Sequence, residues 1–332
     1  MAQRDAPPTF RLMQDRPSAG ILTDKPAERP LPSPEIATVI LNTDRCKDTM
    51  TCVGSLMRQT YERNRIIILD NCANLDCMGE IEARFPEVDI VRLSRNRGYA
   101  GNNNVGIDRA MELGVEWILI LNEDVVLDPD AIECLMSEVA LRSDVGFAGP
   151  IVYHYDEPDV IQSAGGLMTS DWLAYHRGQN EKDDGQYGQV QEVDWVSGCG
   201  ILVRKAAIEQ VGGLDDRYFY YWEETEWCLR GRRSGWKVLF VPKSRIWHKG
   251  VQRDYQPSPS TTYYWVRNWL MTLSKHQAPW SAWLFAGAWI ARNLAAWTLL
   301  PRWSDKRDHR NAVLQGSMDF VRRRWGARPV GR

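Results

Sequence analysis

The sequence predicts an α/β fold with a mostly parallel sheet flanked by helices. Short runs of mainly aliphatic residues recur through the first half of the chain, and stretches with helical spacing lie between them. Continuous apolar runs of this length are typical of buried parallel strands, and their alternation with helices is typical of layered α/β proteins. At 332 residues the chain can form one large domain with appendages or two small domains.

The elements follow in order along the chain. The predicted strands of the first half cover residues 36–41, 66–69, 90–93 and 117–121. A helix after the first strand presents one apolar face, formed by Met50, Val53, Leu56 and Met57. Gly114 is a candidate C-cap for a later helix, because glycine is common just past helix ends. Shorter strands are expected at 201–203 and 238–241.

After the fourth strand, Asp128 can cap a helix and Pro129 can open it. Apolar residues then recur at the spacing of one helix face, at Ile132, Leu135, Met136 and Val139.

Composition limits the classes of function. A net charge of −2 argues against a general nucleic-acid partner. Seven scattered cysteines form neither a disulfide framework nor paired CxxC zinc spacing, so we expect a reducing, cytoplasmic setting. Residues 1–34 are rich in proline and charge, lack the apolar run of a signal peptide, and are interpreted as a disordered leader. The longest apolar stretch, 282–300, contains Arg292, which disfavours a membrane span.

Polar residues follow each predicted strand of the first half, at 42–44, 70–71, 94–96 and 122–124. In open α/β sheets, ligands bind in the crevice outside the carboxyl ends of the strands. Ordinary turn chemistry also favours such residues, so this pattern alone leaves both interpretations open.

Two acidic clusters suggest a divalent cation and a catalytic base. Asn122, Glu123 and Asp124 follow a buried strand, and Mg²⁺ or Mn²⁺ needs only one or two protein carboxylates when a substrate supplies phosphate oxygens. His248 could complete the coordination, although a lone histidine is more often structural. Solvated acids at a strand end are the alternative for this triplet.

The second cluster, 222–227, lies where a helix is predicted to begin. Acidic side chains are favoured there by the positive end of the helix dipole, so part of the pattern needs no chemistry. Glu226 precedes Arg230 by four residues, the spacing of a helix-surface ion pair. Glu224 has Trp227 and Cys228 at the corresponding positions, which predicts a carboxylate that no cation neutralises.

Phosphate-binding motifs are limited to one weak candidate. The sequence contains no GxxxxGK[ST] motif, and the glycine-rich segment 98–106 lacks GxGxxG spacing, so a dinucleotide oxidoreductase is disfavoured. This segment either places backbone donors near an anion at a helix N-terminus or simply turns the chain.

Together these motifs resemble family 2 glycosyltransferases and, in the second half, their rhamnosyltransferase-like branch. The resemblance runs from about 36 to 267. The segments that carry it are 38–42, 70–71, 96–101, 103–106, 121–124, 128–131, 193–198, 212–215, 222–224, 228–230, 241–242 and His248.

The resemblance implies a GT-A fold with a Rossmann-like sheet over residues 35–267, a dTDP- or UDP-linked sugar donor, Mg²⁺ or Mn²⁺, and transfer with inversion. It assigns the metal to Asp124 and His248, the general base to Glu224 with Glu223 beside it, and the acceptor side to Trp195, Gly198 and Trp222. The donor contacts that it implies are Thr43, Asp44, Asp70, Asn71, Asn96, Gly98, Gly101, Asn104, Asn122 and Glu123.

The chain departs from the family pattern in three places. Asn122 replaces the first acid of a strict DxD, which weakens any metal role for Glu123. Glu224 stands where aspartate is frequent, and Asn102 replaces a common glycine.

The resulting function hypothesis is transfer of a sugar, such as rhamnose, to a polysaccharide or lipid-linked glycan, in the cytoplasm at the inner face of the membrane. A non-catalytic nucleotide-sugar or glycan-binding protein and a nucleotidyltransferase are the alternatives. Residues 268–332 are predicted to form a helical, basic, tryptophan-rich extension. That extension suits either peripheral membrane binding or a packed subdomain with Trp283 and Trp289 in its core.

Overall fold

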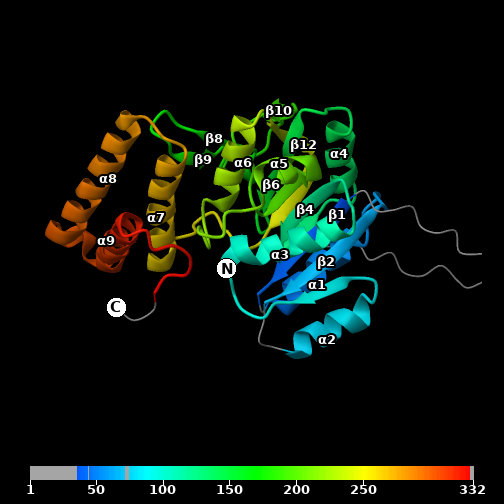
Figure 1. Cartoon of the computed structure of the whole chain (residues 1–332). Coiled ribbons are helices and arrows are strands. Elements are labelled where there is room, and N and C mark those ends of the chain that lie inside the picture. Colours follow the sequence, from blue (N-terminus) through cyan, green and yellow to red (C-terminus); the bar gives the residue numbers. More distant parts are fainter. Residues whose placement is uncertain (1–35, 44, 72–74, 330–332) are drawn as a thin grey trace, which may run out of the picture. The chain divides into compact units, whose positions relative to one another are not determined.

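The computed structural model describes residues 36–43, 45–71 and 75–329. The predicted leader and Asp44 lie outside these residues. The four strands predicted in the first half are present as β1 (Ile36–Asn42), β2 (Asn64–Asp70), β3 (Asp89–Arg92) and β4 (Trp117–Asn122). They pair in parallel in the order β4-β1-β2-β3, so their carboxyl ends meet at one edge (Figure 1).

The second half of the chain extends the sheet beyond β4. β11 (Gly200–Arg204) runs antiparallel to β4 and is followed outward by β6 (Val145–His154) and β12 (Lys237–His248). Short strands complete this part of the structure: β5 (Val125–Leu127), β7 (Ile161–Ser163), β10 (Gln191–Glu192) and the separate pair β8 (Gly166–Met168) and β9 (Ala174–His176). The sheet is therefore mixed, with a parallel portion that carries the predicted crevice.

Helices cover both faces of the sheet, because successive apolar side chains of β1 point to opposite faces and both sets are buried. Ile36 and Ile40 belong to one core cluster, and Ala37 and Val39 belong to the other. The first cluster includes residues of α1 (Cys46–Leu56), α2 (Leu75–Arg84) and α4 (Ala131–Val139). The second includes residues of α3 (Gly98–Glu112), α5 (Lys205–Val211) and α6 (Glu223–Arg233).

The predicted start of α4 is wrong by two residues. Asp130, not Asp128, occupies the N-cap position, and α4 begins at Ala131. The reason is β5, which the sequence analysis did not predict: the Asp128 N–H donates to the Arg245 carbonyl at 3.0 Å, extending the pairing of β5 with β12. The four predicted apolar residues of this helix are buried, as expected.

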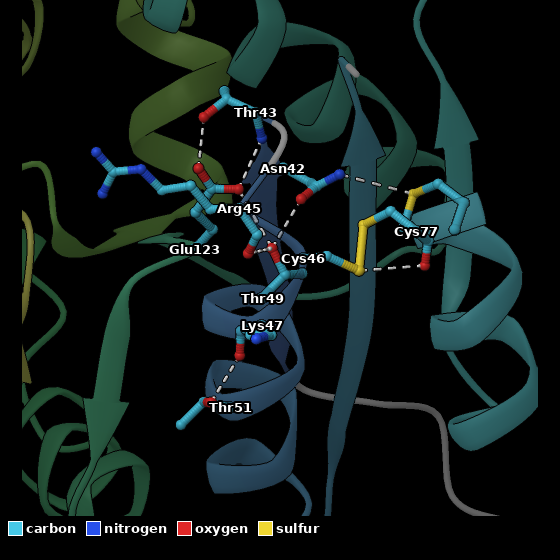
Figure 2. The surroundings of a disulfide bond; sticks show 10 residues. Asn42, Thr43, Arg45, Cys46, Lys47, Thr49, Thr51, Cys77 and Glu123 are labelled. Atoms are coloured by element: carbon cyan, nitrogen blue, oxygen red, sulfur yellow. Dashed lines mark hydrogen bonds between the residues drawn. A yellow bond between two sulfur atoms is a disulfide. The ribbon is translucent and has the colours of Figure 1, made fainter. Parts of the chain in front are cut away.

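The cysteine prediction is also corrected. Cys46 at the start of α1 forms a disulfide with Cys77 of α2, while Cys52, Cys134, Cys199 and Cys228 are free (Figure 2). The two partners are 31 residues apart, so their spacing gave no signal. Their meeting follows from the packing of α1 and α2 on the same sheet face. The cysteine pattern therefore no longer supports a reducing compartment.

The C-terminal region is helical, as predicted, and comprises α7 (Pro259–Lys275), α8 (Trp280–Leu299), the 3₁₀ helix η1 (Pro301–Lys306) and α9 (Arg307–Val321) (Figure 1). Ser258 caps α7 by accepting a hydrogen bond from the Thr261 N–H. The expected boundary between 267 and 268 falls inside α7, whose Arg267 and Asn268 are both buried. Among the described residues, no helix is long and apolar enough to cross a membrane.

Candidate active site

A cavity of about 330 Å³ lies at the carboxyl ends of the parallel strands. The structure brings eight of the predicted site residues to its wall, which are Thr43, Asn71, Asn96, Gly98, Asn122, Glu123, Asp124 and His248. The wall also contains residues that the sequence analysis did not select, including Arg45, Tyr99, Phe219, Tyr220 and Gly250.

Glu123 fixes the loop that follows β1. Its carboxylate accepts hydrogen bonds from the Thr43 N–H at 2.7 Å, from the Thr43 hydroxyl, and from the Thr49 hydroxyl at 3.2 Å (Figure 2). Burial raises the pKa of Glu123, and these hydrogen bonds oppose that effect. The side chain therefore shapes the cavity wall through Thr43, in agreement with the weakened metal role expected from Asn122.

Asp124 and His248 meet because β5 pairs with the end of β12, where Val125 faces His248. The His248 Nε2 atom lies 3.2 Å from Asp124 Oδ1. On the other side of the ring, Nδ1 lies 3.1 Å from the Gln162 amide oxygen, which can accept the Nδ1–H. That hydrogen bond orients the ring so that Nε2 faces Asp124, and a bound cation would take the place of the proton that Nε2 otherwise donates to this carboxylate.

The donor set fits a cation whose remaining ligands come from a diphosphate and water. Asp124 offers oxygen and His248 offers nitrogen, a mixture that favours Mn²⁺ over Mg²⁺. A Cβ on Gly250 would lie 2.5 Å from Asp124 Oδ2 and 3.1 Å from His248 Nε2, so only glycine leaves this space open. Within the described residues, no group of three or more His, Cys, Asp or Glu side chains could hold a metal by itself.

Arg45 supplies positive charge to the same place. Its Nη1 atom lies 2.8 Å from Asp124 Oδ2, and its side chain is half exposed at the cavity. Burial by itself would raise the pKa of Asp124, but the hydrogen bond from His248 and the charges of His248 and Arg45 hold this pKa below its usual value. Asp124 is therefore ionised at neutral pH, as a metal ligand must be.

The second acidic cluster begins α6. The Oε2 atoms of Glu223 and Glu224 are both buried, and neither has a hydrogen-bond partner among the described residues. Burial raises the pKa of Glu224, and backbone N–H groups of Thr225 and Gly198 oppose that rise. Burial and the charge of Glu224 raise the pKa of Glu223. The larger rise falls on Glu223, so a proton shared by the pair is held preferentially by Glu223 rather than by Glu224.

Glu226 has a different environment, as predicted. Its fully buried carboxylate lies 3.1 Å from Arg230 Nε, 2.9 Å from Lys275 Nζ and 3.2 Å from His276 Nε2. Although burial opposes it, these partners lower the pKa of Glu226 to about 2. This carboxylate is neutralised and links α6 to α7, whereas no ion pair of the described residues involves Glu224.

Tyr99 connects the cavity with the acid pair. Its side chain lines the cavity, and its hydroxyl donates to the Gly198 carbonyl at 2.5 Å. Burial raises the pKa of Tyr99, and the charges of Glu223 and Glu224 raise it further. A Cβ on Gly198 would lie 3.3 Å from the Tyr99 hydroxyl and 3.4 Å from Glu224 Cγ, so both side chains pack close to this glycine.

The buried Cys199 thiol links the two acidic clusters electrostatically. Burial raises its pKa to about 12, and the charges of both Asp124 and Glu224 contribute to the rise. Asp124 and Glu224 therefore lie within electrostatic reach of the same group. Glu224 does not itself line the cavity. Tyr99 lines the cavity and, through Gly198, connects it with Glu224.

The segment before α6 has a strained backbone. Phe219, Tyr221 and Trp222 have φ values of 65°, 70° and 76°, in the left-handed region that side chains rarely adopt. Gly98 packs against this segment so closely that a Cβ would lie 2.3 Å from the Phe219 carbonyl oxygen. The strain lies immediately before Glu223 and Glu224, so it sets the direction in which the acid pair points.

Asn268 of α7 holds this segment in place. Its amide donates to the carbonyls of Tyr218 at 3.0 Å, Tyr220 at 2.8 Å and Tyr221 at 2.7 Å. The buried Arg267 adds a hydrogen bond to the Tyr218 carbonyl at 2.8 Å. Side chains of α7 thus satisfy three backbone carbonyl groups of a segment that lies outside the helices and strands.

The family model described as Glycosyltransferase like family 2 matches residues 34–268, more than two thirds of the chain. The chain belongs to this family.

Two curated relatives of this glycosyltransferase are named as rhamnosyltransferases. The N-acetylglucosaminyl-diphospho-decaprenol L-rhamnosyltransferase of Mycobacterium tuberculosis is 24% identical over 271 residues, which cover 73% of this chain and 86% of the relative. The dTDP-rhamnosyl transferase RfbF of Shigella flexneri is 26% identical over 237 residues, which cover 68% of this chain and 77% of the relative.

Solved structures confirm the predicted GT-A fold. GalNAc-T7, solved with UDP, GalNAc and Mn²⁺, matches with a TM-score of 0.59 at 14% sequence identity. The match covers 86% of this chain, which spans only 56% of the length of GalNAc-T7.

Several predicted residues of this glycosyltransferase lie outside the cavity wall. Asp70 is buried at the end of β2, and Gly101 packs within α3 against Arg97. The Asn104 amide exchanges two hydrogen bonds with the Leu214 backbone, at 2.7 and 2.9 Å. On the expected acceptor side, Gly198 contacts Glu224, whereas the other two residues are buried in aromatic clusters, Trp195 beside His176 and Trp222 beside Trp265.

Some of the site residues that the sequence analysis missed had a recognisable signal in the sequence, and others had none. Tyr99 and Gly250 stood inside segments already singled out, but neither a tyrosine hydroxyl nor a glycine signals chemistry by itself. Arg45 follows directly on the polar end of the first strand, and a cation beside a predicted phosphate site was a usable signal. Asn268 lies 47 residues from Tyr221, and no local pattern links them.

Proposed function

We propose that this family 2 glycosyltransferase is metal-dependent and inverting, and that it moves a sugar from a nucleoside-diphosphate donor to a hydroxyl of a glycan or lipid-linked acceptor. One observation carries the proposal: the Asp124–His248 pair in the cavity is joined through Tyr99 and Gly198 to an unneutralised Glu224. A cation ligand on one side and a base on the other are what inversion requires.

Different residues of the cavity would bind the cation, the phosphates and the nucleoside of the donor. Asp124 and His248 would hold the cation, which when bound stabilises charge on the departing diphosphate. Arg45 is placed to bind the same phosphates, since its guanidinium already reaches Asp124 Oδ2. Thr43, Asn71 and Asn96 offer hydrogen bonds to the nucleoside and sugar from the cavity wall.

Glu224 is assigned the proton transfer. The acceptor oxygen forms a bond to the anomeric carbon while the bond from that carbon to the diphosphate oxygen breaks on the opposite face. The acceptor proton passes to Glu224, and the nucleoside diphosphate leaves. Burial and the charge of Glu224 raise the pKa of Glu223, which favours its neutral form beside an ionised Glu224. General-base catalysis of this kind contributes about 10²- to 10⁴-fold.

The relatives favour a deoxyhexose donor. Both relatives named above are rhamnosyltransferases, one with dTDP-rhamnosyl and one with a decaprenol-linked substrate in its name. We therefore propose dTDP-rhamnose as the first donor to test, with UDP-linked sugars as the comparison. A saccharide linked to a lipid through a diphosphate is the acceptor class to test first.

The test is Glu224→Gln. Transfer to acceptor should fall about 10²- to 10⁴-fold, while the thermal shift produced by the donor with Mn²⁺ should persist, because the donor cavity is unchanged. The matched control is Glu133→Gln, which alters an exposed acid in the first turn of α4. Wild-type turnover in Glu224→Gln would refute the base assignment. Release of pyrophosphate from a nucleoside triphosphate would instead identify a nucleotidyltransferase.

A further inference from the structure

The outward face of α8 is predominantly apolar. Only Ala282 and Ala286 of its 20 residues are buried. The helix contains no Asp or Glu and a single basic residue, Arg292. The exposed residues recur at helical spacing on one side, and they are Trp280, Ser281, Leu284, Gly287, Ala288, Ala291, Arg292, Ala295, Thr298 and Leu299.

The inner face of α8 is packed, so its orientation is fixed. Trp289 lies 6.0 Å from Trp269 of α7 between ring centroids, and Trp283 lies 5.9 Å from Phe320 of α9. Both tryptophans are partly buried and pack against the core cluster of the C-terminal helices. The opposite face is consequently held toward the surroundings, with Trp280 75% exposed, Leu284 63% and Leu299 73%.

Such a surface is unusual for a helix that faces water. Helices on protein surfaces normally carry charged and polar residues on the side opposite the core. The apolar face continues past the end of α8 through Leu300 and then through Trp303 of η1, which are also exposed. An apolar face of this length therefore needs an apolar partner.

The charge around the face identifies that partner. Residues 276–332 contain ten Lys and Arg and three Asp, although the whole chain has a net charge of −2. Arg292 lies on the apolar face itself, and just beyond its end Arg302, Lys306 and Arg307 outnumber the exposed Asp305 and Asp308. A second copy of the same face would bring like charges together, whereas an anionic lipid surface complements them.

We propose that the outer face of α8 together with η1, hereafter the docking face, lies on the surface of a membrane that contains anionic lipids. The helix lies in the plane of the interface, with Leu284 and Leu299 in the acyl boundary and the Arg302 and Arg307 guanidinium groups at the phosphates. Trp280 and Trp303 mark the two ends, where tryptophan suits the headgroup level. Docking does not depend on sugar transfer, so binding alone tests it.

The experiment is co-sedimentation of the full chain with vesicles of phosphatidylcholine alone or with about one third phosphatidylglycerol. The wild-type chain should sediment with the anionic vesicles at low salt and be released as salt rises, because screening weakens the charge attraction. Leu284→Glu and Ala291→Glu should each bind at least tenfold more weakly. Glutamate is a good helix former, and both positions are exposed, so the fold should survive.

Two controls separate docking from other effects. Leu141→Glu changes an equally apolar side chain that is 91% exposed between α4 and β6, and it should bind as the wild type does. Arg302→Gln combined with Arg307→Gln should reduce binding to anionic vesicles without touching the apolar face. Wild-type chain that stays in the supernatant at low salt would overturn the proposal. So would a dimer, seen by light scattering, that Leu284→Glu dissociates in the absence of vesicle binding.

Discussion

Asn268→Ala tests whether α7 positions the catalytic acid pair. The substitution removes the hydrogen bonds to the Tyr218, Tyr220 and Tyr221 carbonyls. Tyr218 keeps the bond from Arg267, so two carbonyls lose their donor. An unsatisfied buried carbonyl costs about 1–3 kcal/mol. Tyr220 is 44% exposed, so water can replace part of its lost hydrogen bond, and we expect a total cost of about 2–4 kcal/mol.

Loss of the Asn268 hydrogen bonds should lower the activity by more than the loss of stability alone would explain. A left-handed φ at a residue with a side chain costs roughly 1–3 kcal/mol, and three such residues lie in segment 219–222. Without Asn268 the segment can relax and carry Glu224 with it. A displacement of about 1 Å at a reacting group can cost roughly 10²-fold, so we expect kcat to fall about 10- to 100-fold with little change in KM for the donor.

The assay combines thermal unfolding with steady-state transfer. The midpoint should fall by about 4–8 °C, at roughly 2 °C per kcal/mol for a chain of this size. The control is Asn293→Ala in α8, which removes one hydrogen bond from the Asn293 amide to the Trp289 carbonyl of its own helix. Equal kcat values for the two variants would refute the positioning role. A shift in the acid limb of the kcat–pH profile for Asn268→Ala alone would support it, since a purely structural loss leaves that limb unmoved.

Three further predictions test the pKa shifts and the cation site. The base is active when ionised, and burial raises the pKa of Glu224, so kcat should fall with decreasing pH, with a midpoint pH above 4.5, the usual pKa of glutamate. Glu223→Gln mimics a protonated Glu223, so a rate–pH titration of this variant should show the same acid limb and most of the activity. Gly250→Ala should weaken Mn²⁺ binding about 10- to 100-fold in a donor thermal-shift titration, because the new methyl group crowds Asp124 Oδ2, whereas Gly79→Ala, with no atom within 4 Å, should not. The pKa of Glu226 is lowered from 4.5 to about 2, so its ionised form contributes about 3 kcal/mol to the free energy of unfolding. This contribution is present above pH 5 and is lost as the pH falls toward 2. Denaturant unfolding of Glu226→Gln should show the loss already at pH 7, and an unchanged free energy of unfolding there would contradict the prediction.

Periodicity and strand-end polarity predicted the parts of the site that local sequence determines. The strands before Asn42 and Asn122 are buried apolar runs, and parallel pairing places their ends side by side, with Leu41 opposite Asn122. That geometry depends only on which runs are strands and which way they point. The carboxyl-edge cavity with Thr43, Glu123 and Asp124 could therefore be predicted without coordinates.

The rest depends on contacts between residues far apart in the chain. β5 has only three residues, and its pairing with β12 moved the start of α4 and brought Asp124 to His248, which is 124 residues away. The Cys46–Cys77 disulfide depends on how α1 and α2 pack, which their spacing does not encode. Positive φ angles at Phe219, Tyr221 and Trp222 contradict local preference, and only tertiary hydrogen bonds explain them.

Helix α7 connects the catalytic domain with the other C-terminal helices. The expected division at 267 separated the catalytic domain from an extension, yet α7 serves both. On one side Asn268 holds the segment before the acid pair, and Lys275 and His276 bind Glu226 of α6. On the other side Trp269 packs against Trp289 of α8, whose outer face is the docking face. A rigid helix thus joins the surface proposed to meet the lipid to the carboxylate proposed to take the acceptor proton. This arrangement suits an acceptor that stays attached to the membrane while its hydroxyl reacts, because docking then fixes the height of Glu224 above the lipid surface.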